Sequence, residues 1–281
     1  MPDNSTKLYD GHDYQLYPYK PSLAAAVTFT ALFAVLAVLH AYYLFKYKGW
    51  YFIPFLLGVI FEAIGYGGRL AGHYHPYSIS WYVLQAIFIW IAPTMIAVCI
   101  FMTLSRIAIA LESEDLLIIR PKWLTIIILC GYFISLFAQI WGARYIIRDD
   151  PTEVKAGIIV FVGGLSIQIL LSSALIVVAL MFHRCLRKYP AGANDLARGR
   201  KYLYVFYAAS SFILVRSIFR VVLSVTPYGI PSLSTEAHLY IFDATLMALT
   251  IIVYLVVKPY GELFDEWKRR KDLGDPELSK T

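Results

Sequence analysis

The fold of this chain is decided by the stretch LVRSIFRVV, residues 214–222. Two arginines, Arg216 and Arg220, interrupt an otherwise apolar run from about residue 202 to 225, which is long enough to cross a bilayer as a helix. Residues four apart lie on one face of a helix, so both guanidinium groups project together. A charge at membrane depth costs roughly 3 kcal/mol on insertion scales and usually faces a bundle interior. The stretch therefore predicts a bundle of membrane-spanning helices that accommodates two buried charges.

The composition supports a membrane protein. Of the 281 residues, 59% are hydrophobic and 16% are charged, whereas soluble domains are about half apolar and about a quarter charged. The net charge of +6 comes from basic residues gathered in particular loops. This clustering indicates membrane topology and not nucleic-acid binding. The three cysteines are too few for a disulfide framework.

Seven apolar segments of about 20 residues or more follow one another along the chain. They cover residues 22–45, 51–71, 80–105, 123–145, 156–182, 202–226 and 238–258. The connectors are short, and none is long enough to hold a second domain. We therefore predict an all-α fold, a polytopic seven-transmembrane-helix bundle over residues 22–258. An N-terminal segment, 1–21, precedes this domain, and a basic tail, 259–281, follows it.

Lysine and arginine are distributed unequally between the two sides of this bundle. Of the 25 basic residues, 17 fall on the side of the C-terminal tail, five on the opposite side and three within helices. Short loops rich in Lys and Arg remain in the cytosol. The N-terminus is therefore predicted outside and the C-terminus in the cytosol. This orientation places the glycosylation sequon at Asn4 on the outside.

Polar side chains inside the predicted helices gather at similar depths. The candidate substrate-binding residues are Gln85, Gln139, Arg216, Arg220 and Asp243 in the predicted outer half, Arg69 at its rim, Glu236 at the mouth of the last helix, and Glu62 and Gln168 deeper. Within the helices, three arginines face two carboxylates, which leaves one positive charge. Either Glu236 or an anionic group of a ligand is expected to neutralise it. A polar cavity that opens outward above apolar walls suits an amphipathic ligand such as a lipid.

Six short motifs follow one another in order on these helices. They are EAIGYGGR at 62–69, Gln85 with Ala92-Pro93, Ser135 with Gln139 and Gly142, Gly164-Leu165 with Gln168, RSIFR at 216–220, and Glu236 with Tyr240, Phe242 and Asp243. Together they resemble the fungal lipid-translocating exporter family, also called the resistance-to-aminocholesterol-like family. The chain departs from the family pattern at Tyr132, Leu223 and Thr235, where members often carry Asp, Glu and His. With two carboxylates missing, the arginines are expected to form an exposed positive wall of the cavity.

The resemblance implies a multi-pass membrane protein of the fungal plasma membrane or an internal membrane. It implies transport of sphingoid long-chain bases, resistance to toxic amphiphiles such as sterol-like amines, or, in one branch, porphyrin uptake. The chain has no GxxxxGK[ST] nucleotide-binding motif. Active transport would therefore depend on a gradient, with Glu62 or Asp243 as the proton carrier. The expected partners are membrane lipids or amphipathic small molecules and no nucleic acid. We expect no catalytic residue, metal or cofactor.

Three alternatives remain open at this stage. The arginines can pair with buried carboxylates and only lock the fold. A seven-helix receptor or sensor for a lipid-like ligand has the same predicted architecture. A zinc hydrolase needs several histidines in one membrane layer, but His73 and His75 fall in an outer loop and His40 and His183 near cytosolic helix ends. The sequence therefore favours a transporter over an enzyme.

Overall fold

The protein is described by a computed structural model that covers most of the predicted bundle. The described residues are 22–75, 78–111, 117, 120–146, 150–187, 193–225 and 236–257. Asn4, the N-terminal segment and the basic tail lie outside them. All regular structure in this part of the chain is helical.

The described residues form ten helical elements. They are α1 (Leu23–Tyr47), η1 (Trp50–Phe52), α2 (Ile53–Tyr74), α3 (Ile79–Ala110), α4 (Pro121–Ile146), α5 (Pro151–Leu186), α6 (Ala193–Val225), α7 (Glu236–Leu239), η3 (Tyr240–Thr245) and α8 (Leu246–Val257). The η1 turn leads directly into α2, and α7, η3 and α8 follow one another without a break. Within the described residues, seven helical stretches are long and apolar enough to cross a membrane. The predicted all-α bundle of seven spanning helices is confirmed, and the orientation remains a prediction.

The fifth helix is longer than the apolar pattern predicted. The sequence predicted the fifth helix over residues 156–182, but α5 runs over 36 residues. Its start is set by Asp150, whose side-chain Oδ1 accepts a hydrogen bond of 2.8 Å from the backbone N–H of Thr152. Pro151 follows at the first position, where a missing N–H costs nothing. The N-terminal end of α5 is therefore fixed by the cap and not by hydrophobicity, so the polar residues before position 156 are part of the helix.

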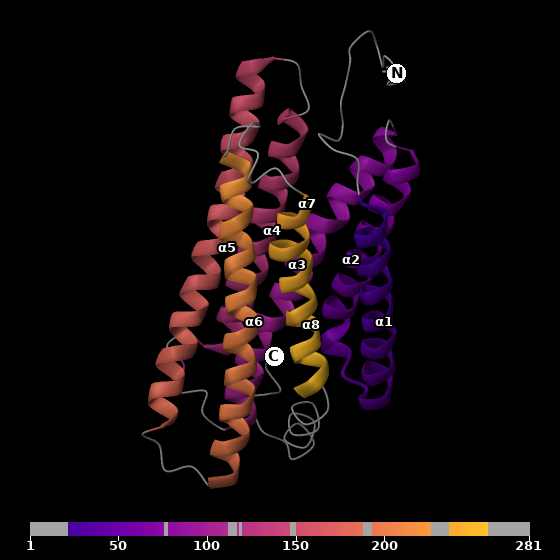
Figure 1. Cartoon of the computed structure of the whole chain (residues 1–281). Coiled ribbons are helices and arrows are strands. Elements are labelled where there is room, and N and C mark those ends of the chain that lie inside the picture. The colour runs from indigo at the N-terminus through magenta and orange to yellow at the C-terminus, as the bar shows by residue number, and fades with distance from the viewer. Residues whose placement is uncertain are drawn as a thin grey trace, which may run out of the picture.

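The helices lie roughly along one common direction (Figure 1). Figure 1 shows α1 and α2 at one edge of the bundle and α5 at the opposite edge. The closest packing joins α2 to α3, α4 to α5 and α1 to α2, and α6 reaches α3, α5 and α8. The sixth and last spanning helices therefore meet beside α3, where the buried charges lie.

The α4–α5 contact depends on glycines whose backbones touch. A Cβ atom on Gly142 would lie 2.6 Å from the backbone nitrogen of Phe161 and 2.7 Å from the carbonyl oxygen of Gly157. A Cβ on Gly157 would in turn meet the carbonyl oxygen of Gly142 at 2.8 Å. Small residues permit this approach, which is a common way to pack membrane helices.

We expect Gly142→Ala to destabilise the bundle by about 1–3 kcal/mol, because the added methyl group meets backbone atoms that cannot rotate away. Gly163→Ala is the matched control on α5, since a Cβ there has nothing within 4 Å. Thermal unfolding of the purified proteins in detergent measures both effects. Equal melting temperatures for the two variants would contradict this account of the α4–α5 contact.

Candidate functional site

Asp243 binds both arginines of the sixth helix. Its Oδ2 accepts a hydrogen bond of 2.6 Å from Nη2 of Arg220, and its Oδ1 accepts one of 3.1 Å from Nε of the same residue. Oδ1 also lies 2.5 Å from Nε of Arg216, an ion pair without hydrogen-bond alignment. Asp243 is 2% exposed and Arg216 is 5% exposed. One carboxylate therefore neutralises part of two buried positive charges.

A proline in α3 supplies the second partner of Arg216. Pro93 has no N–H, so it cannot bond the carbonyl four residues before it, that of Ile89. Nη2 of Arg216 donates to that carbonyl oxygen at 3.3 Å. This distance is longer than that of a typical N–H···O hydrogen bond, which is about 2.9–3.0 Å. The guanidinium thus joins a helix interruption in α3 to the aspartate of the last helix.

The helix around Asp243 is itself irregular. Residues Tyr240–Thr245 form η3, a turn of π-helix between α7 and α8. The hydroxyl of Thr245 donates to the carbonyl oxygen of Tyr240 at 2.9 Å. Turns of π-helix inside membrane helices are rare and are often found at functional sites.

Arg69 binds the same turn from the side of α2. Its Nε donates a hydrogen bond of 3.0 Å to the hydroxyl of Tyr240, and its guanidinium lies 5.3 Å from the centroid of that ring. Arg69 is 2% exposed. The third arginine of the sequence pattern therefore reaches η3, although it contacts a tyrosine there.

Glu62 is the least exposed of the charged candidates whose exposure is known. It is 1% exposed, and its Oε1 has no hydrogen-bond partner among the described residues. One turn along α2, the buried hydroxyl of Tyr66 also lacks a partner within this part of the chain. The predicted carboxylate is therefore close to the charged cluster but does not take part in its ion pairs.

Gln139 and Gln168 form a separate polar network between α4 and α5. The side-chain amide of Gln139 donates to the hydroxyl of Ser135 at 3.0 Å and to Oε1 of Gln168 at 3.4 Å. The hydroxyl of Ser135 donates to the carbonyl oxygen of Gly164 at 2.8 Å. These contacts hold α4 against α5, and no described contact joins Gln139 or Gln168 to the arginines.

The remaining candidates are placed less directly. Gln85 is 7% exposed on α3 and packs against Gly68 of α2. Glu236 opens α7, but its side chain lies outside the described part of the structure. Tyr132, where family members often carry Asp, shares a hydrogen bond of 2.7 Å with the hydroxyl of Ser172. It belongs to the α4–α5 network.

The interpretation of the arginines as an exposed positive wall is wrong for this conformation. Arg216 is enclosed between Asp243 and the Ile89 carbonyl, and 14% of the Arg220 side chain is exposed. Comparing the numbers of arginines and carboxylates in the helices identified Asp243 as a partner of the arginines, but it did not show that the helices close around these charges. The polar cluster is sealed here, and a ligand would have to open it.

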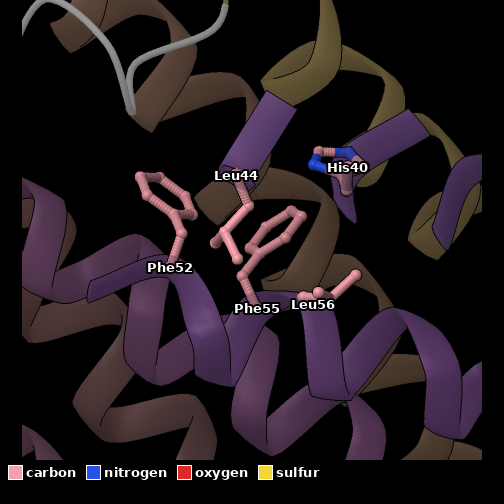
Figure 2. A pocket seen from close by; sticks show the side chains of 5 residues that line it. All are labelled: His40, Leu44, Phe52, Phe55 and Leu56. Atoms are coloured by element: carbon pink, nitrogen blue, oxygen red, sulfur yellow. The ribbon is translucent and has the colours of Figure 1, made fainter. Parts of the chain in front are cut away.

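Figure 2 shows an internal crevice elsewhere, between α1 and the start of α2. The crevice is lined by His40, Leu44, Phe52, Phe55 and Leu56, and it has no room for a water molecule. Ligand sites typically measure roughly 300–1,000 Å³. The crevice lies toward the end of the bundle that holds Phe52, away from the charged cluster, and is too small for a lipid.

Sequence reasoning missed two partners of the cluster. Tyr240 appeared as a motif residue but not as the acceptor for Arg69. The Ile89 carbonyl was missed although the signal is present, because a proline inside a helix always frees the carbonyl four residues earlier. Among the described residues, no three His, Cys, Asp or Glu side chains gather as a metal ion would require.

Comparison with known proteins identifies one family and several yeast relatives. The family described as RTA1 like protein matches residues 55–266. Protein RTA1 of Saccharomyces cerevisiae is 29% identical over 277 residues, which cover 89% of this chain and 87% of the relative. Protoporphyrin uptake protein 1 of the same yeast is 27% identical over 300 residues, covering 93% of this chain and 98% of the relative.

A third relative matches over a shorter part of both chains. The sphingoid long-chain base transporter RSB1 of Saccharomyces cerevisiae is 28% identical over 188 residues, 66% of this chain and 47% of the relative. No solved structure matches the chain.

Proposed function

Because the chain belongs to the RTA1-like family, we propose that it moves amphipathic lipids or lipid-like toxic compounds across a membrane. The observation that carries this proposal is the cluster of Arg216, Asp243 and Arg220 buried within the spanning helices. Buried ion pairs contribute little net stability compared with apolar residues of the same size. Charged groups at membrane depth mark substrate paths more often than they serve packing.

The relatives support the class of substrate. The names of two of them include porphyrin uptake and transport of sphingoid long-chain bases. Both kinds of compound combine a large apolar body with polar or charged groups. A head group of this kind needs partners inside the bilayer, and the charged cluster supplies donors and acceptors within the apolar bundle.

The nine candidate residues divide into two groups in this proposal. Arg69, Arg216, Arg220, Asp243 and Glu62, together with Gln85 and Glu236 near the same helices, line the path of the head group. Gln139 and Gln168 hold α4 to α5 and fix one wall of that path. The path opens to the outside in the orientation that the basic loops indicate. The fungal plasma membrane is the proposed location.

Reconstitution tests the proposal directly. Purified protein is placed in phosphatidylcholine vesicles, and a fluorescent sphingoid base is followed from one leaflet to the other. We expect faster movement than in protein-free vesicles, and no effect of adding ATP, because the sequence lacks a nucleotide-binding motif. Rates equal to those of empty vesicles would overturn the proposal. Saturable binding without movement would favour a lipid sensor in its place.

A further inference from the structure

Glu62 is left out of the ion pairs that surround it. Asp243 forms ion pairs with both Arg216 and Arg220. In contrast, Oε1 of Glu62 has no hydrogen-bond partner in the part of the chain described. An ionised carboxylate with no donor facing it costs far more to bury than a protonated carboxyl group. With 1% of Glu62 exposed, a bound proton removes this cost in the closed bundle.

The charges that act on Glu62 come from the sixth and the last spanning helices. They are Arg216 and Arg220 of α6 and Asp243 of η3. The helices that pack most closely on α2 are α1 and α3, and neither contributes a charged group to this set. The ionisation of Glu62 is therefore tied to the arrangement of the arginine–aspartate cluster.

Other titratable groups of the neighbouring helices are engaged elsewhere. His40 of α1 lies 3.2 Å from the carbonyl oxygen of Ile251. Cys99 of α3 donates to the carbonyl oxygen of Tyr51 in η1, the turn that precedes α2. On α2 itself, Arg69 binds Tyr240 of η3.

The two arginines hold Asp243 unequally. Arg220 makes two hydrogen bonds to the carboxylate, a fork that resists removal. Arg216 has an ion pair without hydrogen-bond alignment and one long bond to the Ile89 carbonyl. Arg216 is therefore the guanidinium that can leave Asp243 at lower cost. Its positive charge also acts on Glu62.

We propose that Glu62 is a proton-binding site controlled by Arg216. With Arg216 on Asp243, Glu62 keeps its proton. When a lipid head group opens the cluster, Arg216 turns to Glu62, whose O–H bond breaks with the electron pair remaining on the carboxylate, and the proton passes to water that enters with the head group. This inference rests on the proposed lipid movement, and it adds that one proton is exchanged in each cycle.

The pH profile of lipid movement tests the inference. Vesicles with equal pH inside and outside are prepared over a range of pH, and movement of a fluorescent sphingoid base is measured after subtraction of protein-free rates. We expect the wild-type rate to change with pH and the profile of Glu62→Gln to be flat. A purely structural role of Glu62 would lower the rate at every pH and leave the shape of the profile unchanged. Tyr66→Phe is the matched control, because it removes a buried hydroxyl one turn away without removing a carboxyl group.

Each outcome separates this inference from the proposed function. A wild-type rate that does not vary with pH, or a Glu62→Gln profile equal to that of wild type, overturns the proton site while lipid movement stands. Absence of movement in wild type overturns the proposed function itself. If Glu62→Gln does not fold, wild type alone decides: adding the already protonated sphingoid base to weakly buffered, detergent-solubilised protein should release more protons than the same addition to protein-free detergent. An equal release in both samples would contradict the proposal.

Discussion

Asp243→Asn is expected to remove about 3–5 kcal/mol of stability, because two buried arginines lose their shared counter-ion. The asparagine keeps the size of the side chain, so packing around η3 changes little and the loss is electrostatic. The expected result is a lower melting temperature in detergent and less folded protein at growth temperature. Fluorescence-detected gel filtration of the expressed variant measures both.

Asp150→Asn is the matched control for this change. Asp150 is exposed and caps α5 through its side-chain oxygen, and asparagine caps a helix about as well as aspartate. Its melting temperature should stay close to that of wild type. Adding Arg220→Gln to Asp243→Asn should recover part of the loss, since one unpaired charge disappears. A stable Asp243→Asn variant would show that the ion pairs do not hold the bundle together.

Arg216→Gln is expected to abolish most lipid movement while the protein remains folded. Arg220 alone still neutralises Asp243 through two hydrogen bonds, so the fold keeps its main ion pair. The variant loses one charge-assisted interaction of about 2–3 kcal/mol, which corresponds to roughly a hundredfold in rate if the interaction acts only during transport. Initial rates in vesicles, corrected for folded protein, give the result.

Arg220→Gln is the variant with which Arg216→Gln is compared, both in melting temperature and in transport rate. Because Arg220 makes two hydrogen bonds to Asp243, whereas Arg216 makes an ion pair without hydrogen-bond alignment, removal of Arg220 should lower the melting temperature more than removal of Arg216. If both variants lose stability equally and retain the wild-type rate, the arginines only lock the fold. That outcome would support the structural alternative that the sequence left open.

The seven helices and the meeting of Arg216, Arg220 and Asp243 follow from the sequence. Apolar length fixes the spans, and the spacing of four places both arginines on one face, where one carboxylate reaches both. Whether the site is open or closed does not follow from the sequence. Depth along each helix predicts which charges share a layer, but it does not show how closely the helices approach. The expected open cavity was therefore wrong for this conformation.

The separation of the glutamines has the same cause. Gln139 and Gln168 were predicted to bind substrate together with the arginines, because all are polar residues within the membrane. Their partners are instead decided by the approach of α4 to α5 at Gly142 and Gly157, where the backbones touch. A contact between two backbones at glycine leaves no hydrophobic pattern from which to predict which side chains meet beside it.

The π-helical turn at Tyr240–Thr245 also limits how the last helix can change its length. A turn of π-helix holds one more residue than the α-helix that flanks it. Deleting one residue there would restore regular α-helix. Because the wide turn absorbs its extra residue, α7 and α8 would keep nearly the same relative orientation, whereas the side chains between them would change direction. Asp243 opposite α6 and Tyr240 opposite Arg69 would then no longer hold their present positions together. Insertions and deletions in this segment are therefore far less tolerable than substitutions, although most of its residues touch no charge.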